Sequence, residues 1–282
     1  MGGQAYMIRE IQSGRVIEKI CFPVAPQTKA RKGRQRGNTL PRKQDANERA
    51  CTKRLARLLN CNFRAGDLLL SPSYDAEHME ALLEKAGEDA DAIRRKAEHV
   101  VELFLRRLKR ELEKAGVELR YIAVTSDMDG DTGELVRVHH HIVIPSDGVT
   151  MVSGELFVGK RRLADIWGQG DMDYRPLHHQ DDYTPLAEYL MRQVRRLPDA
   201  RKYKPSRNLR KPQLISERIV YTSRELRVPK GAKLLCRAAY LPGEAQYIRY
   251  VREDQPKRRG GRSHGGGKAE STDRGTGTDR AI

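Results

Sequence analysis

The chain lacks the features that would place it in a membrane or in an oxidising compartment. It has no uninterrupted apolar run of about 18 residues, the length that crosses a bilayer. Its opening stretch, MGGQAYMIREIQSG, has no continuous apolar core of the kind a signal peptide needs. The four cysteines are scattered and form no CxxC pair, which argues against a zinc ribbon or a disulfide framework: Cys21, Cys51, Cys61 and Cys236. We therefore expect a soluble, cytoplasmic protein with reduced cysteines and no membrane partner.

Acidic residues and nucleotide-binding loops are also scarce. The chain has 38 Asp and Glu residues against 54 Lys and Arg, which gives a formal net charge of +16 and a pI near 9.8. Such an excess favours a polyanionic partner, and without a membrane segment that partner is expected to be nucleic acid. No GxxxxGK[ST] phosphate loop is present, so the sequence shows no helicase motor of that class.

The N-terminal part of the chain predicts a hairpin followed by a basic arm. Polar and apolar residues alternate over 5–22 about a turn at Ser13 and Gly14. Residues 28–43 then hold seven basic residues: Lys29, Arg31, Lys32, Arg34, Arg36, Arg42 and Lys43. Two interpretations of this arm are compatible, a solvated linker and a phosphate-binding segment that orders on contact with nucleic acid.

Apolar periodicity in the rest of the chain predicts alternating helices and strands. The predicted helices lie at 45–60, 76–115 with a break at Gly87, within the stretch LADIWGQG, and from Pro185 to Arg196. The predicted strands lie at 68–71, 119–126, 135–144, after the LADIWGQG helix, and within 215–252. Thr184 is the expected N-cap of the last helix, and Pro198 closes it.

This order of elements predicts an α+β fold with a central antiparallel sheet flanked by helices. The expected organisation has four parts: a hairpin and basic arm over 1–43, the main domain over 44–215, a strand-rich extension over 216–254, and a disordered basic and glycine-rich tail over 255–282. The N- and C-terminal parts are thus expected as peripheral additions to one domain.

Three consecutive histidines lie in the predicted strand RVHHHIVI. Side chains alternate along a strand, so His140 shares a face with Val138 and Ile142, near the edge of the core, while His139 and His141 point together to the other side. Two imidazoles spaced in this way can bind one divalent cation. The alternative is that they are surface residues of a half-exposed sheet.

The helix that follows carries a candidate nucleophile. Leu186, Leu190 and Val194 form its expected buried stripe, and Tyr189 borders that stripe. Arg192 and Gln193 lie three and four positions further on, so both share the side of Tyr189. A phenol attacks poorly at neutral pH unless a cation stabilises the phenolate, which a metal ion and Arg192 would do. Tyr183 precedes the helix, so one tyrosine is expected to act; the alternative is a packed core tyrosine.

Together these motifs resemble the HUH endonucleases, the class that holds rolling-circle replication initiators, relaxases and related transposases. The resemblance is strongest to replication-associated proteins of small phages and bacterial mobile elements, related to filamentous-phage initiators. It covers roughly residues 28–215 and rests on an ordered set of segments: NFRAGDLLLSPSY, RVHHHIVI, IWGQG, LAEYLMRQ and SRNLRKP.

The resemblance implies roles for particular residues. His139 and His141 would bind Mg²⁺ or Mn²⁺, and Tyr189 would be the nucleophile, with Arg192 in place of the lysine usual in the family. The third ligand of the family is often acidic; Ser126 occupies that place here, and Asp127 is the nearest substitute. Further contacts to DNA phosphates are expected from two basic clusters: Lys29, Arg31, Lys32, Arg34 and Arg36 in the arm, and Lys202, Lys204, Arg207, Arg210 and Lys211 in the loop.

The implied activity is metal-dependent, site-specific nicking and joining of single-stranded DNA at a replication origin, through a 5′-phosphotyrosine intermediate. Host helicase and polymerase would be its partners. Three alternatives remain: a conjugative relaxase of the same chemistry, a DNA-binding protein without catalysis, and a metal-dependent hydrolase that uses water. A hydrolase would leave no covalent protein–DNA product, and a binding protein would show salt-dependent binding without cleavage.

Overall fold

The computed structural model describes residues 4–24, 41–87, 89–195, 201–221, 225–240 and 245–252, without the side chains of 41–44, 239 and 240. These residues all belong to one compact unit, Met1–Arg252. The five basic residues predicted between 29 and 36, and the predicted tail over 255–282, lie outside the described residues. Within the described part of the chain, no helix is long and apolar enough to cross a membrane.

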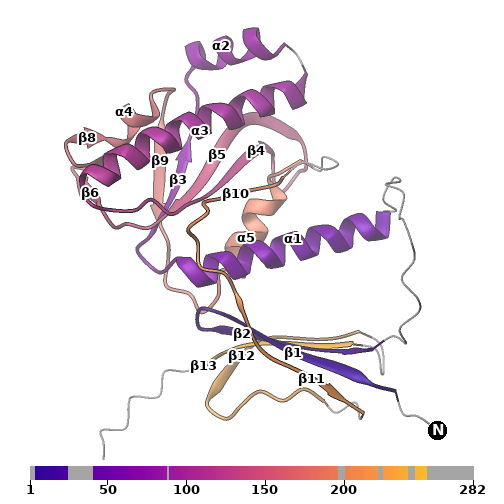
Figure 1. The fold of residues 1–282 in the computed structure, drawn as a ribbon. Helices are drawn as coiled ribbons and strands as arrows, with labels where there is room; N and C mark the ends of the chain where they lie inside the picture. The colour runs from indigo at the N-terminus through magenta and orange to yellow at the C-terminus, as the bar shows by residue number, and fades with distance from the viewer. Residues whose placement is uncertain are drawn as a thin grey trace, which may run out of the picture. The chain divides into compact units, whose positions relative to one another are not determined.

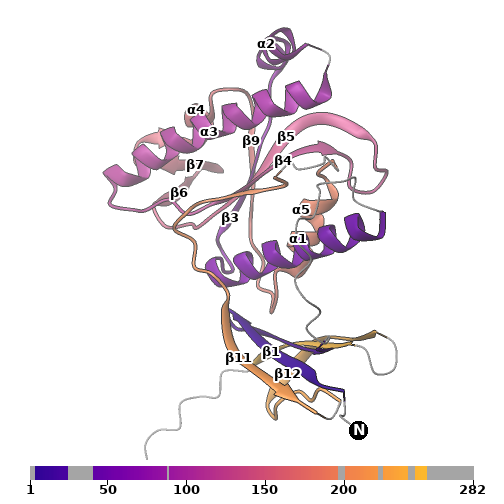
Figure 2. The ribbon, with the colours of Figure 1, turned by 45° about the vertical axis from the view of Figure 1, so that its right-hand side comes forward.

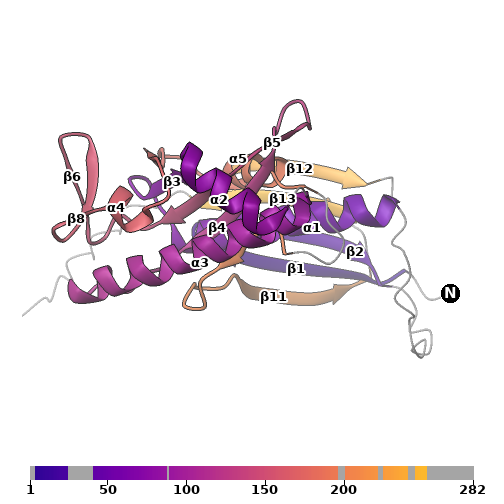
Figure 3. The ribbon, with the colours of Figure 1, turned by 90° about the horizontal axis from the view of Figure 1, so that it is seen from above.

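A five-stranded antiparallel sheet forms the centre of the fold (Figure 1). Its strands run in the order β10-β4-β5-β3-β9: β10 Lys204–Pro205, β4 Ile122–Met128, β5 Leu135–Ile144, β3 Leu68–Pro72 and β9 Met172–Pro176. Because β5 is the middle strand and is the longest of the five, the residues at its centre are shielded by a neighbour on each side. The end of the β4–β5 hairpin projects beyond the other strands (Figure 3).

One face of this sheet is covered by α3, Ala90–Lys114, as Figure 2 shows. The helix forms because its apolar residues recur every three or four positions, which puts them on one stripe. Val101, Phe104 and Leu108 of that stripe pack against Ile142 and Ile144 of β5. The side chain of Asp89 caps the first turn, a contribution of about 1 kcal/mol. Helix α2, Ala76–Ala86, precedes α3 and ends at Gly87, where the predicted break lies.

The opposite face is covered by α1, Pro41–Asn62, and α5, Thr184–Arg192. Leu55 and Leu59 of α1 and Leu190 of α5 are fully buried against Ile122 and Val143 of the sheet. Burying such a side chain contributes about 1.5–3 kcal/mol, so this second core fixes α5 firmly on the sheet. The predicted N-cap of α5 is wrong by one residue: the N-cap is Tyr183, and Thr184 is the first residue of the helix, where its backbone N–H and its hydroxyl both donate to the carboxylate of Asp182.

The N-terminal hairpin and the C-terminal strands form a single second sheet. Its order is β11-β1-β2-β13-β12, with these bounds: β1 Tyr6–Ser13, β2 Val16–Pro23, β11 Gln213–Val220, β12 Ala232–Tyr240 and β13 Ala245–Arg252. All neighbours are antiparallel, and β1 and β2 lie between strands from the far end of the chain. Glu18 of β2 pairs with Arg57 of α1 and accepts from the Tyr247 hydroxyl at 2.6 Å, which ties this sheet to α1.

The remaining elements lie between β5 and β9 in the sequence. A small antiparallel sheet is formed by β6 Val149–Val152, β7 Glu155–Val158 and β8 Arg161–Arg162, and α4 follows at Leu163–Trp167. The sequence analysis did not predict this small sheet. With it, the protein is a mixed α+β fold built on antiparallel sheets, as the order of elements predicted.

Candidate metal and tyrosine site

The histidine strand presents its side chains alternately to the two cores. Val138, Ile142 and Ile144 pack in the α3 core, and Val143 packs in the α1–α5 core. His139 and His141 share one side, as the alternation predicted; that side is the one of Val143, so the pair faces α5, whereas the sequence analysis did not place a helix there. On the neighbouring strand β4, Ser126 pairs with His139 and Val124 pairs with His141.

His140 is not near the edge of the core, where the sequence analysis placed it. Its side chain is completely buried, and its ring lies 5.7 Å from the indole of Trp167. Both ring nitrogens are hydrogen-bonded, Nε2 to the hydroxyl of Tyr74 at 2.9 Å and Nδ1 to the hydroxyl of Thr125 at 3.1 Å. Burial lowers the pKa of His140 to about 3, so it is neutral at physiological pH and serves the core.

The two outer histidines are oriented by contacts to their Nδ1 atoms. His139 Nδ1 lies 3.0 Å from the carbonyl oxygen of Arg137, to which it donates, and His141 Nδ1 lies 3.3 Å from the hydroxyl of Ser71 on β3. Because a carbonyl only accepts, His139 carries a proton on Nδ1, which leaves Nε2 as the lone-pair nitrogen of the neutral ring. Metal-binding histidines are usually held by such a contact to the second nitrogen.

Both Nε2 atoms converge on the side chain of Gln193. The Gln193 Oε1 lies 3.0 Å from His141 Nε2 and 3.4 Å from His139 Nε2, and the two rings lie 5.0 Å apart. The other end of the amide donates to the backbone carbonyl of Tyr189 at 3.3 Å, which orients the oxygen towards the histidines. Donors that share one octahedral cation at 2.0–2.1 Å are about 3 Å apart, and both distances from Gln193 Oε1 to the imidazole nitrogens are close to that value.

The burial of His141 favours its neutral imidazole. Only 5% of His141 is exposed, and this burial lowers its pKa to about 4, with a smaller contribution from the neighbouring His139. A metal ion binds the neutral form of histidine, so His141 does not have to lose a proton at pH 7 before it binds.

Tyr189 lies beside this cluster and is open to solvent. Its ring centre is 5.6 Å from that of His141, and 43% of the residue is exposed. Tyr183, one residue before α5, is buried in the α1–α5 core instead, and burial raises its pKa. The expectation that one tyrosine is available therefore agrees with the exposure of the two side chains.

The structure does not bring Asp127 to the histidine pair. Its carboxylate receives hydrogen bonds from the backbone N–H and the Nε of Arg195, at 3.2 and 3.1 Å, and lies 3.6 Å from the buried Arg94 of α3. A register shift between Ser126 and Met128 accompanies this arrangement. No three His, Cys, Asp or Glu side chains of the described ranges gather as ligands, because the third group at the pair is an amide.

Arg192 ends α5 and is exposed next to the β4–β5 turn. A Cβ added at Gly130 in that turn would lie 3.5 Å from the Arg192 Cβ and 3.3 Å from the Gln193 Cγ. The backbone N–H groups of Asp127 and Met128 both donate to the carbonyl of Gln193 at 3.2 Å. The turn thus holds the end of α5 against β4, and this contact places Gln193 in front of the histidines.

Two of the five basic residues predicted in the loop form ion pairs within the protein. Lys202 pairs with Glu48 at 3.0 Å, and Lys204 pairs with Glu102. Three further residues of the predicted set are exposed: Arg207, Arg210 and Lys211. These three are better placed to contact a phosphate than the two paired lysines, because an existing ion pair must be broken before either lysine can bind.

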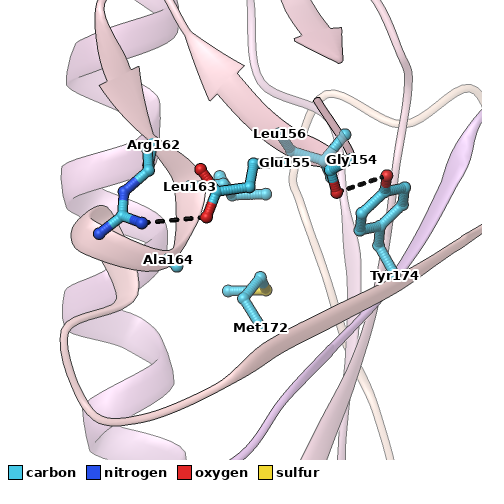
Figure 4. Close-up of a pocket in the computed structure, with 8 residues that line it drawn as sticks. All are labelled: Gly154, Glu155, Leu156, Arg162, Leu163, Ala164, Met172 and Tyr174. Atoms are coloured by element: carbon cyan, nitrogen blue, oxygen red, sulfur yellow. Dashed lines mark hydrogen bonds and ion pairs between the residues drawn. The ribbon is translucent and has the colours of Figure 1, made fainter. Parts of the chain in front are cut away.

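A separate small pocket lies between the tip of the β6–β7 hairpin, α4 and β9, as Figure 4 shows. Its volume is about 70 Å³, and its rim is closed by an Arg162–Glu155 ion pair and by a hydrogen bond from the Tyr174 hydroxyl to the Gly154 carbonyl. None of its lining residues belongs to the histidine strand or to α5, so we do not assign it to this site.

No protein-family model, no curated protein and no solved structure matches this chain. The resemblance to HUH endonucleases therefore rests on the ordered motifs of the sequence alone.

Proposed function

We propose that this protein is a metal-dependent tyrosine endonuclease and strand transferase of the HUH type, acting on single-stranded DNA in the initiation of rolling-circle replication. The observation that carries the proposal is that His139 Nε2 and His141 Nε2 both approach Gln193 Oε1 beside an exposed tyrosine. The central sheet with its α1–α5 face would be the palm of that enzyme class. The net charge of +16 suits a DNA substrate.

In this proposal His139, His141 and Gln193 hold Mg²⁺ or Mn²⁺, and Asp127 is a structural residue. A bound cation would neutralise charge on the scissile phosphate and polarise a non-bridging oxygen. The hydroxyl oxygen of Tyr189 attacks phosphorus and loses its proton to solvent, forming the phosphotyrosine bond. The bond from phosphorus to the 3′ oxygen breaks, and that oxygen takes up a proton. Arg192, three residues from Tyr189, offsets the negative charge that develops.

The product of this step retains the energy of the phosphodiester in the tyrosine link. The free 3′-hydroxyl can prime synthesis by a host polymerase, and a later 3′-hydroxyl can attack the link and rejoin the ends. The exposure of Tyr189 supports such an exchange, because both strand ends must reach the same phenolic oxygen. A relaxase would use the same chemistry, so the biological setting is a separate question from the reaction.

The test is formation of a covalent adduct. The protein is incubated with Mn²⁺ and two labelled single-stranded DNA substrates, a random-sequence pool and oligonucleotides taken from the sequence that flanks its gene. Adducts are resolved on a denaturing gel. We expect an adduct that is lost in Tyr189→Phe and with EDTA, and that persists in Tyr183→Phe, the matched control. An adduct that survives in Tyr189→Phe would remove the nucleophile, and one that survives both EDTA and His139→Ala/His141→Ala would remove the metal.

The alternative of a DNA-binding protein without catalysis has one observation in its favour. His141 can donate its Nε2 proton to Gln193 Oε1 while Ser71 donates to Nδ1, which satisfies that ring without any ion. In the same arrangement a neutral His139 with its proton on Nδ1 would face the oxygen of Gln193 with the lone pair of Nε2. Titration with Mn²⁺ distinguishes the two, because the binding protein predicts no saturable Mn²⁺ site that depends on His139 and His141.

A further inference from the structure

Arg137 occupies a special position next to the histidine pair. It lies two residues before His139 on β5, and Val138 between them faces the α3 core. The pairing of β5 with β4 changes register between Leu135 and His139, and the carbonyl oxygen of Arg137 lies 3.0 Å from His139 Nδ1. The main chain of Arg137 therefore lies directly beside the His139 ring.

The guanidinium of Arg137 is held in place by backbone and not by a carboxylate. Its Nη2 donates to the carbonyl oxygens of Tyr74 and Asp75, at 2.5 and 2.7 Å. The Nη1 and Nε atoms have no acceptor among the described residues, and no described carboxylate pairs with them. The nearby Asp75 carboxylate is engaged by the backbone N–H and the ring of His78, which, with a smaller effect from Arg137, keep its pKa low.

An arginine that is oriented in this way, yet retains its charge and three N–H donors, is prepared to bind an anion. Ordering a free arginine costs conformational entropy, and here the two carbonyl contacts have already met part of that cost. A purely structural role would use only the two carbonyl contacts, and the remaining N–H donors would be bonded to water. The residue is exposed at the surface, so a ligand can reach it.

We propose that Arg137 binds the phosphodiester next to the one held at His139 and His141, and so sets which linkage of the DNA is placed beside Tyr189. This assignment rests on the proposed function for the position of the scissile phosphate. The guanidinium keeps its charge, and the N–H groups of Nη1 and Nε that remain can donate to a phosphate oxygen. The main chain of the same residue accepts from His139 Nδ1, so Arg137 contributes both to the metal ligand and to the substrate.

The first experiment measures the salt dependence of binding to a fluorescent 20-nucleotide pool of random single-stranded DNA. Each phosphate contact on a single strand contributes about 0.7 to the slope of log affinity against log salt. We expect Arg137→Gln to lose about that amount and to bind about tenfold more weakly at low salt. Arg218→Gln, which removes an equal charge from exposed β11, is the matched control and keeps the wild-type slope. An unchanged slope in Arg137→Gln would overturn the proposal.

The second experiment places the contact next to the scissile linkage. The DNA captured as a covalent adduct is sequenced, and the same oligonucleotide is then made with a neutral methylphosphonate at one linkage at a time. We expect that a methylphosphonate at one linkage adjacent to the cleaved one weakens binding by the wild-type protein. The same substitution should leave binding by Arg137→Gln unchanged. If neither adjacent linkage shows this loss of sensitivity, the placement is wrong although the nicking activity stands. If wild type forms no adduct, the proposed function fails, and the salt slope still reports the phosphate contact by itself.

The variant Arg137→Lys shows whether Arg137→Gln loses affinity because it is less stable or because it lacks the phosphate contact. This variant keeps the charge but cannot span two carbonyls and a phosphate with one planar group. We expect it to retain the wild-type salt slope with reduced affinity. If Arg137→Gln loses the slope only together with a lower temperature of thermal unfolding, and Arg137→Lys shows the same two losses, the slope reports folding and the proposal is wrong.

Discussion

The buried histidine at the centre of the strand makes a quantitative prediction about pH and stability. His140 is completely buried between Tyr74 and Trp167, and its pKa falls from 6.5 to about 3 in the folded protein. The pKa of His141 falls to about 4 through burial in the same strand. In the unfolded chain both rings return to ordinary values, so below pH 6.5 the unfolded state binds more protons than the folded state.

The sign and size of the effect follow from this difference. Stability is complete above the unfolded pKa of 6.5 and decreases as the pH falls towards the folded values, because only the unfolded chain takes up the protons. Between pH 7.5 and pH 5.0, each ring lowers the free energy of unfolding by about 2 kcal/mol, which makes about 4 kcal/mol for the pair. That is a large part of the 5–15 kcal/mol that a domain typically has.

The assay is urea unfolding at pH 7.5 and pH 5.0 in the presence of EDTA, so that no cation competes for His141. Trp167 is the only tryptophan, and it is fully buried 5.7 Å from the His140 ring, so its fluorescence reports the unfolding of this core. We compare wild type with His140→Gln, which removes the titrating ring but keeps a polar side chain for Thr125 or Tyr74. His178→Gln, at an exposed position, is the control.

We expect His140→Gln to be less stable than wild type at pH 7.5, and to lose about 2 kcal/mol less than wild type on acidification. The control should show the wild-type loss. If His140→Gln and wild type lose the same free energy between the two pH values, the buried ring does not titrate on unfolding and the reasoning is refuted.

Three further outcomes follow from the contacts described above. Gln193→Ala should weaken Mn²⁺ binding by about tenfold or more in calorimetry, whereas Asp127→Asn should leave it within about twofold; equal effects would contradict the choice of ligand. Asp127→Asn should instead lower the free energy of unfolding by about 1–3 kcal/mol, because the buried Arg94 loses one of its two carboxylate partners and keeps only Glu98. Gly14→Ala should destabilise far more than Gly159→Ala in thermal unfolding, although both backbones are left-handed, at φ 61° and 60°. The added Cβ at Gly14 meets the Asn60 carbonyl oxygen at 2.1 Å, whereas at Gly159 it meets nothing within 4 Å and costs about 1–2 kcal/mol; similar losses would mean that the hairpin does not pack there.

Local patterns in the sequence were sufficient for most of the central elements. The strand predicted at 135–144 and the helix break at Gly87 agree with β5 and with the α2–α3 junction. The shared side of His139 and His141 was also predictable, because strand periodicity is a property of the backbone and does not depend on what packs against it. The same reasoning put Gln193 on the side of Tyr189, although nothing in the sequence marked its amide as a ligand.

What only the tertiary structure decided were the partners of these side chains. Asp127 follows Ser126 on β4, so strand alternation turns it away from the face of His139 and towards Arg94 of α3, whereas the end of α5 brings Gln193 to the imidazoles. No local pattern shows that the end of α5 packs beside β4, because that contact joins residues far apart in the sequence. The sequence analysis likewise predicted the N-terminal hairpin and the C-terminal strands as separate additions. Their common sheet was not predictable from local patterns, because the pairing of β2 with β13 joins residues more than two hundred positions apart. The sequence by itself therefore determined which face the histidines share, whereas long-range packing decided which groups meet them there.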